Sequence, residues 1–267
     1  MAVTVSATRD RYIVVAGVAC LAALAWFDLV RRANGMTPGM STGTDPMTGM
    51  GMAMAMPMST PWNVSVWIAA VLMWSVMMVA MMLPSTTPML LLFSGVQRAR
   101  RTAADPALPT GLFAAGYLGV WVAWSVLAAG LQWILQSLLL LSPQLAATRV
   151  VLAASFLMLA GLYQLTPVKY ACLARCQTPL GFLLTQWREG PGGALRMGAR
   201  YGATCAGCCW ALVGLLFVGG VMNLLWVAAV AVFVLAEKVT RGPWLARGAG
   251  GAFIGWALYV LRAGLTG

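Results

Sequence analysis

Long apolar runs, separated by short polar or glycine- and proline-rich segments, dominate the pattern of hydrophobic positions along the chain. A helix needs about 20 apolar residues to cross a bilayer. Seven runs approach or exceed this length: 12–30, 62–83, 110–136, 149–168, 200–219, 222–237 and 247–263. The pattern therefore predicts an all-α fold, a polytopic transmembrane helix bundle of about seven helices.

Composition supports this prediction and excludes a soluble protein. The 267 residues are 61% hydrophobic and only 9% charged, which leaves too little polar surface for a soluble domain of this size. The first apolar run is longer than the apolar core of a signal peptide and lacks a clean cleavage site. It is therefore expected to be retained as the first membrane helix.

The distribution of positive charge orients the predicted bundle. With the N-terminus placed inside, thirteen of the 17 Lys and Arg residues fall on the inner side and four on the outer side. This asymmetry follows the positive-inside rule. It predicts a multi-pass protein of the bacterial inner (cytoplasmic) membrane with a cytoplasmic N-terminus. Orientation thus accounts for the net charge of +11, and the expected partner is the lipid bilayer rather than nucleic acid.

Changes in composition divide the chain into three regions. Residues 1–30 hold an N-terminal tail and the first span, 31–61 form an outer loop, and 62–267 form the membrane domain. The outer loop is rich in Gly, Pro, Ser, Thr and Met without any period, which predicts disorder. Within the inner segment 170–199, Gly190–Gly193 are expected to form a turn between short interfacial helices. Small residues four apart predict close helix packing, in two sets: Gly111, Ala115 and Gly119, and Ala199, Ala203 and Gly207.

Several kinds of chemistry are excluded. The chain contains no histidine, which removes the commonest metal ligand and general base. It also lacks the glycine-rich loops that bind phosphates. We therefore expect a protein that is neither an enzyme nor an ATP-driven pump. Glu237 and Lys238 are expected to form an interfacial pair, and Asp28 to pair with Arg31 or Arg32.

Methionines crowd the outer loop. Eight of them lie within 23 residues: Met36, Met40, Met47, Met50, Met52, Met54, Met56 and Met58. A solvated, aperiodic segment has no core to fill, and a thioether is a soft ligand that selects Cu(I). The loop is predicted to collect this ion, with a low-complexity linker as the alternative.

A second set of methionines follows one face of the span 62–83. Met73, Met77 and Met81 recur every four residues, and Met78 and Met82 form a neighbouring pair. Residues four apart share a helix face, so they form a stripe of sulfur atoms, although methionine is also an ordinary core residue. The span ends in "PSTTP" at 84–88, which predicts either a broken helix lining a cavity or the inner end of the helix.

Thiols form two groups on the inner side. Cys172 and Cys176 follow the fourth span, and Cys205, Cys208 and Cys209 begin the fifth. Spacings of three and four residues place thiols on one helix face, where they can share one soft metal ion. Nearby Lys169, Arg175 and Arg200 are expected to favour thiolates. Small apolar packing is the alternative, and it is the interpretation favoured for Cys20.

Several of these motifs together resemble a known family. The segments "MWSVMMVAMMLPSTTPML", "KYACLARCQTPL", "GATCAGCCWAL", "GVMNLLW" and "AEK" are similar to the DUF2182 family of predicted metal-binding integral membrane proteins, often labelled copper chaperones. The resemblance covers about 62–262. It implies roles for a set of residues that the motifs share: Met81, Met82, Pro84, Cys172, Cys176, Cys205, Cys208 and Cys209. Val213 stands where the family often has methionine.

These observations predict an integral membrane protein that binds Cu(I) and acts in copper uptake, relay or delivery, with a soluble copper carrier or a cuproenzyme as its recipient. The candidate ligands are the two thiol groups, the methionine stripe and Met50, Met52, Met54, Met56 and Met58 of the loop. Two alternatives stay open. One is a membrane thiol redox or electron-transfer subunit. The other is a non-catalytic assembly subunit whose cysteines hold a structural metal such as zinc.

Overall fold

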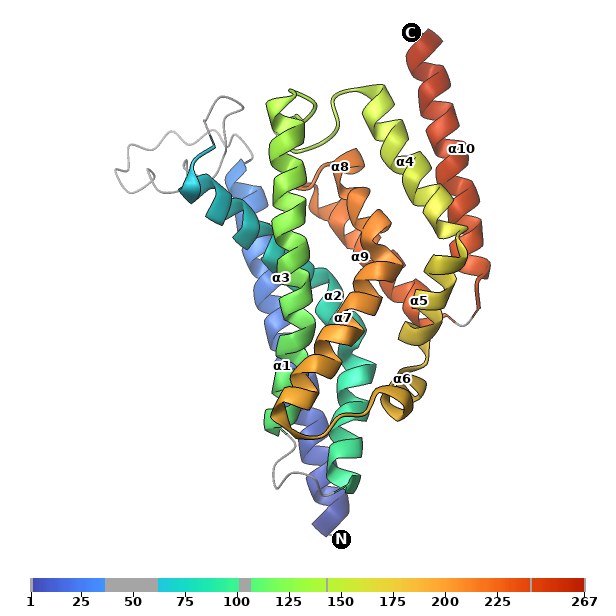
Figure 1. The fold of residues 1–267 in the computed structure, drawn as a ribbon. Coiled ribbons are helices and arrows are strands. Elements are labelled where there is room, and N and C mark those ends of the chain that lie inside the picture. The colour runs from blue at the N-terminus through green and yellow to red at the C-terminus, as the bar shows by residue number, and fades with distance from the viewer. Residues whose placement is uncertain (1, 37–61, 101–106, 143, 241, 267) are drawn as a thin grey trace, which may run out of the picture.

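A computed structural model describes residues 2–36, 62–100, 107–142, 144–240 and 242–266 (Figure 1). Every regular element within these ranges is an α-helix, which confirms the all-α prediction. The helices are α1 (Ala2–Met36), α2 (Val64–Arg100), α3 (Ala107–Ser137), α4 (Val150–Gln164), α5 (Pro167–Gln177), α6 (Pro179–Gln186), α7 (Gly190–Gly214), α8 (Leu216–Gly219), α9 (Leu224–Val239) and α10 (Trp244–Thr266).

Fewer helices than predicted are long and apolar enough to cross a membrane. Among the described residues, four segments qualify: Arg11–Asn34, Val64–Arg100, Ala107–Ser137 and Gly190–Gly219. A fifth is obtained if α4 and α5, which are bent by 67° at the short break between them, count as one span. The predicted number of about seven spans is therefore not confirmed.

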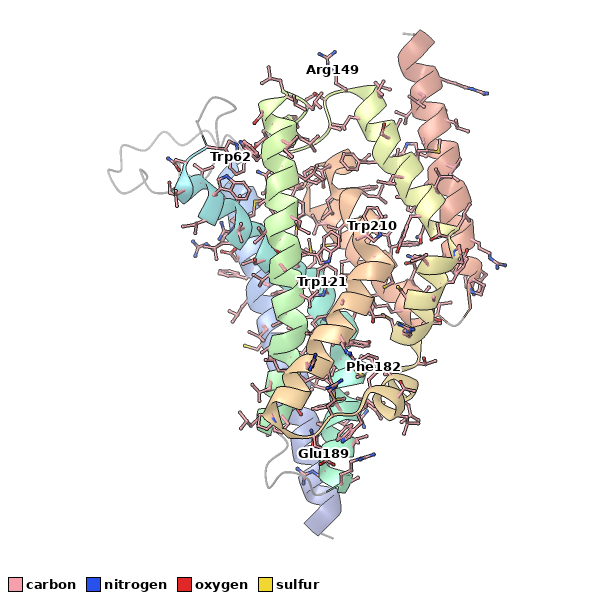
Figure 2. All side chains as sticks on the ribbon, viewed as in Figure 1. Trp62, Trp121, Arg149, Phe182, Glu189 and Trp210 are labelled. Carbon is pink, nitrogen blue, oxygen red and sulfur yellow. The ribbon has the colours of Figure 1, made fainter. Side chains whose placement is uncertain are left out.

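The helices run roughly along one long axis, with the N- and C-terminal ends of the chain at opposite ends of the bundle (Figure 1). Helix α3 packs along α7, α1 along α2, and α10 along α4. The short helix α9 contacts α2, α5 and α7. Figure 2 shows Arg149 at the end of the bundle where α4 begins and Glu189 toward the other end, beside the start of α7. On α1, Asp28 accepts a hydrogen bond from Arg32 over 2.5 Å, one of its two predicted partners.

Helix α2 continues through Pro84 and Pro88 and ends only at Arg100, so both predictions for "PSTTP" were wrong. A proline lacks the N–H that the carbonyl four residues earlier normally accepts. The Pro84 carbonyl, which loses the N–H of residue 88, accepts instead from the Thr87 hydroxyl over 2.8 Å. The hydroxyls of Ser85 and Thr86 both donate to the Met82 carbonyl. The Thr87 hydroxyl thus replaces one of the two backbone hydrogen bonds that the prolines remove.

Helix α7 begins ten residues before the predicted span. Gly190–Gly193 form its first turn rather than a turn between helices, and Gly190 has a positive φ of 78° where the chain enters the helix. The added turns bury Ala194 and Met197 in the bundle. Beyond the glycines, the backbone at Leu195 and Gly198 packs against α3, a contact that local composition does not reveal.

The backbones of α3 and α7 touch at glycines other than those predicted. A Cβ on Gly198 would lie 1.9 Å from the Phe113 carbonyl oxygen, and one on Gly116 would lie 2.1 Å from the Leu195 carbonyl oxygen. Gly111 and Gly119, by contrast, have open space where a Cβ would be. Close packing through small residues is therefore present, on a different face of α3 from the predicted one. On α7 it includes the predicted Ala199, whose amide nitrogen lies 2.9 Å from the Cβ position of Gly116.

Candidate metal centre

The two predicted thiol groups meet between α5 and α7. The sulfur atoms of Cys176 and Cys208 lie 4.0 Å apart, and both side chains are buried. The sulfur of half-buried Cys172 lies 3.1 Å from the place where a Cβ on Gly207 would be, so the missing side chain makes room for it. Cysteines that the sequence places on two separate segments therefore form one cluster in the structure.

Within α7 the thiols are held by their own helix. Cys208 and Cys209 both donate to the Cys205 carbonyl, over 3.1 Å and 2.9 Å, in the way that short polar side chains bond back to the preceding turn. In the part of the chain that the structure describes, no group of three or more His, Cys, Asp or Glu side chains is arranged to hold a metal ion. The arrangement here is therefore a pair of sulfurs with further thiols beside it.

Cys205 is in contact with a cation that the sequence did not assign to it. The Lys238 ammonium, from the end of α9, donates to the Cys205 sulfur over 3.0 Å and to the Ser85 hydroxyl over 2.6 Å. Of the predicted cations, Lys169 binds Glu237 and Arg200 donates to Gln186, whereas Arg175 is exposed on α5 and acts electrostatically on Cys172. Among the described residues, Lys238 is therefore the cation in contact with Cys205, and Arg175 adds an exposed positive charge near Cys172.

Glu237 and Lys238 do not pair with each other, so that prediction was wrong. Glu237 accepts from the Lys169 ammonium over 2.7 Å and from the Gln164 amide over 2.7 Å. Lys169 and Glu237 are both buried. Consecutive residues of a helix point about 100° apart, so Glu237 faces α4 and α5 while Lys238 faces α2 and α7. The buried ion pair fixes α9 against the helix that carries Cys172 and Cys176.

Tyr117 of α3 links the methionine helix to the thiols. Its fully buried hydroxyl donates to the Met82 carbonyl over 3.1 Å and lies 3.2 Å from the Cys205 sulfur. Tyr117 was not predicted from the sequence, because no motif in α3 marks it. Ser85, as part of "PSTTP", and Lys238 were predicted with other roles.

The predicted methionine ligands have two different outcomes. On α2, Met73, Met77, Met78, Met81 and Met82 are all buried within the same core. This position is compatible with both interpretations, and their role as ligands stays a prediction. Met50, Met52, Met54, Met56 and Met58 lie outside the described residues, as does the rest of the loop after Met36.

Removing the Tyr117 hydroxyl is expected to destabilise the bundle modestly. Tyr117→Phe deletes the donor to Met82 and the partner of Cys205, and a lost buried hydrogen bond costs about 1–2 kcal/mol. Thermal unfolding in one detergent measures the change. Tyr259→Phe is the matched control because Tyr259 is 70% exposed. Equal unfolding midpoints for the two variants would contradict the role given to this hydroxyl.

The chain is a helical bundle in which α5 and α7 bring two buried cysteine sulfurs together. Residues 71–260 match the model of the PpoB2 family, described as copper chaperone. The chain belongs to this family. The match supports a copper-related role and agrees with the copper chaperone label that the sequence resemblance implied, although it does not carry the DUF2182 name. No curated protein and no solved structure matches the chain.

Proposed function

We propose that this protein is an integral membrane protein that binds Cu(I) and takes part in its uptake, relay or delivery without catalysing a reaction. The observation that carries the proposal is the 4.0 Å separation of the Cys176 and Cys208 sulfurs within the region matched by the copper chaperone family. Metal–sulfur bonds of about 2.3 Å place two sulfurs that share one ion at most about 4.6 Å apart. The pair therefore needs little adjustment to bind one Cu(I).

The direction proposed for the ion is inward. Methionines of the 31–61 loop collect it on the outer side, the methionines of α2 pass it along, and the thiols receive it near the inner side. Thiolate binds Cu(I) more tightly than thioether, so affinity increases along this route. The Tyr117 hydroxyl, which joins the Met82 backbone to Cys205, supports a short distance between the last methionines and the thiols.

The lipid bilayer is the proposed environment, in the bacterial inner membrane with the N-terminus in the cytoplasm. The four long apolar helices support a membrane location. A soluble copper carrier or a cuproenzyme is the proposed recipient of the ion. In that arrangement Cys172, the half-buried member of the cluster, is the thiol through which a recipient reaches the metal.

A titration of the purified full-length protein with Cu(I), against a chromophoric Cu(I) chelator, tests the proposal. Cys176→Ser and Cys208→Ser are each expected to weaken the tightest binding by about a hundredfold, because each removes one of two ligands. Cys20→Ser is the control, since Cys20 is an exposed thiol on α1 outside the matched region. Unchanged affinity and stoichiometry in both cluster variants would refute the thiol site.

The same preparation separates the two alternatives. A chromophore in its absorption spectrum would favour an electron-transfer subunit. Metal analysis that finds zinc alone, whatever copper is supplied, would favour a structural site.

A further inference from the structure

The ammonium group of Lys238 lies at the thiol cluster, and no carboxylate among the described residues pairs with it. Its two hydrogen-bond partners in the structure are the Ser85 hydroxyl and the Cys205 sulfur. The nearest acid in sequence, Glu237, is bound to Lys169 and Gln164 on the other side of α9. The Lys169–Glu237 pair therefore carries no net charge. Among the described residues, the positive charge in contact with the buried thiols is that of Lys238, while Arg175 is an exposed charge near Cys172.

Thiols alone do not decide which metal binds. Cysteine sulfur suits Cu(I) and zinc alike, and zinc accepts three or four thiolates. Cys172, Cys176, Cys205, Cys208 and Cys209 supply enough thiols for either ion if the helices adjust. A preference for one ion therefore needs a second feature of the site.

Charge provides such a feature. For a given number of thiols that lose their protons, a divalent ion brings one more positive charge to the cluster than a monovalent ion does. The ammonium repels that extra charge, and the repulsion is strong where side chains are buried and water is scarce. Cys205, which the ammonium contacts, is one helical turn from Cys208 of the sulfur pair and is 1% exposed. The ammonium is therefore close enough to distinguish the two charges.

We propose that Lys238 makes the thiol cluster selective for a monovalent soft cation, Cu(I) or Ag(I), over a divalent one such as Zn(II). The inference rests on the proposed copper-binding function and adds the residue that determines its specificity. Lys238 acts on the metal through space and through Cys205 and is not itself a ligand. Ser85 holds the ammonium in place from α2.

The ratio of the Zn(II) to the Cu(I) dissociation constant tests this inference. Both are measured on the full-length protein in detergent, each by competition with a chromophoric chelator. Lys238→Met and Lys238→Gln remove the charge and are expected to lower the ratio by about tenfold or more. Lys238→Arg keeps the charge and is expected to retain the ratio of the unaltered protein. A purely structural role for Lys238 would change the two affinities in parallel and leave their ratio unchanged.

A second variant neutralises the charge without removing the lysine. Ser85→Asp places a carboxylate beside the ammonium and is expected to move the ratio toward zinc. Ser85→Asn introduces a side chain of the same size without charge and is expected to move the ratio less. This pair decides the matter if the Lys238 variants do not fold. If the ratio is unchanged in Ser85→Asp, or in folded Lys238→Met and Lys238→Gln, the inference about Lys238 is overturned and the proposed function is not. Cu(I) binding that does not depend on Cys176 or Cys208 instead overturns the proposed function itself.

Discussion

Lys169→Met is expected to lower the free energy of unfolding by about 3–5 kcal/mol, because it leaves the Glu237 carboxylate buried without its counter-charge. Lys169 is fully buried and Glu237 is 3% exposed, so water cannot replace the lost partner. The Gln164 amide still donates to the carboxylate, but a neutral donor offsets only part of the cost. Chemical unfolding in one detergent measures the loss.

A double variant separates the ion pair from mere packing. Lys169→Met combined with Glu237→Gln removes both charges and keeps an amide oxygen for Gln164 to bond. Replacing both partners of a buried pair is often close to neutral, so the double variant is expected to recover most of the stability. A double variant as unstable as Lys169→Met would show that the lysine matters through its volume and not through its charge.

Gly198→Ala is expected to cost about 3 kcal/mol or more, since its Cβ would overlap the backbone of α3. The overlap is with the Phe113 carbonyl oxygen at 1.9 Å and its carbon at 2.8 Å, neither of which a rotamer change can move. The two helices, which contact each other extensively, would have to separate. The same unfolding measurement, in the same detergent, detects the loss.

Gly119→Ala provides the control on α3, where a Cβ meets nothing within 4 Å. There the added methyl group removes backbone freedom from the unfolded chain, and stability is expected to rise by up to about 1 kcal/mol. If both substitutions changed stability equally, the contact between α3 and α7 would not depend on the absence of a side chain at Gly198.

Much of the fold could be predicted from the apolar pattern, because the same pattern decides which segments become helices. The errors have local and distant causes. Prolines normally end helices, yet α2 continues, and the hydroxyl of the neighbouring Thr87 replaces the N–H missing at Pro88. Helix α7 begins earlier than predicted, and the residues after its glycine-rich start, at Leu195 and Gly198, pack on α3. Which glycines touch depends on the rotation of each helix, and spacing alone does not give that rotation.

The candidate site, too, could be predicted only in part. Cysteine spacing and the charge asymmetry placed five thiols near one side, and the structure brings Cys176 and Cys208 together. Which cation meets them could not be predicted, because it depends on how α9 is packed among its neighbours. Tyr117 lies 88 positions before Cys205 in the chain, and only the packing of α3 on α7 brings its hydroxyl to that sulfur.

Two consecutive residues at the end of helix α9 bind different neighbouring helices. Glu237 attaches it to α5, and Lys238 attaches it to α2 and α7. The Gln177 amide adds a third attachment to the last turn through the carbonyls of Glu237 and Thr240. A rotation of α9 about its own axis would pull on all three attachments together. Helix α9 therefore cannot move in response to a change at the thiols independently of α5. If a bound ion displaced Lys238, the displacement would be transmitted to α5, the helix that carries Cys172 and Cys176.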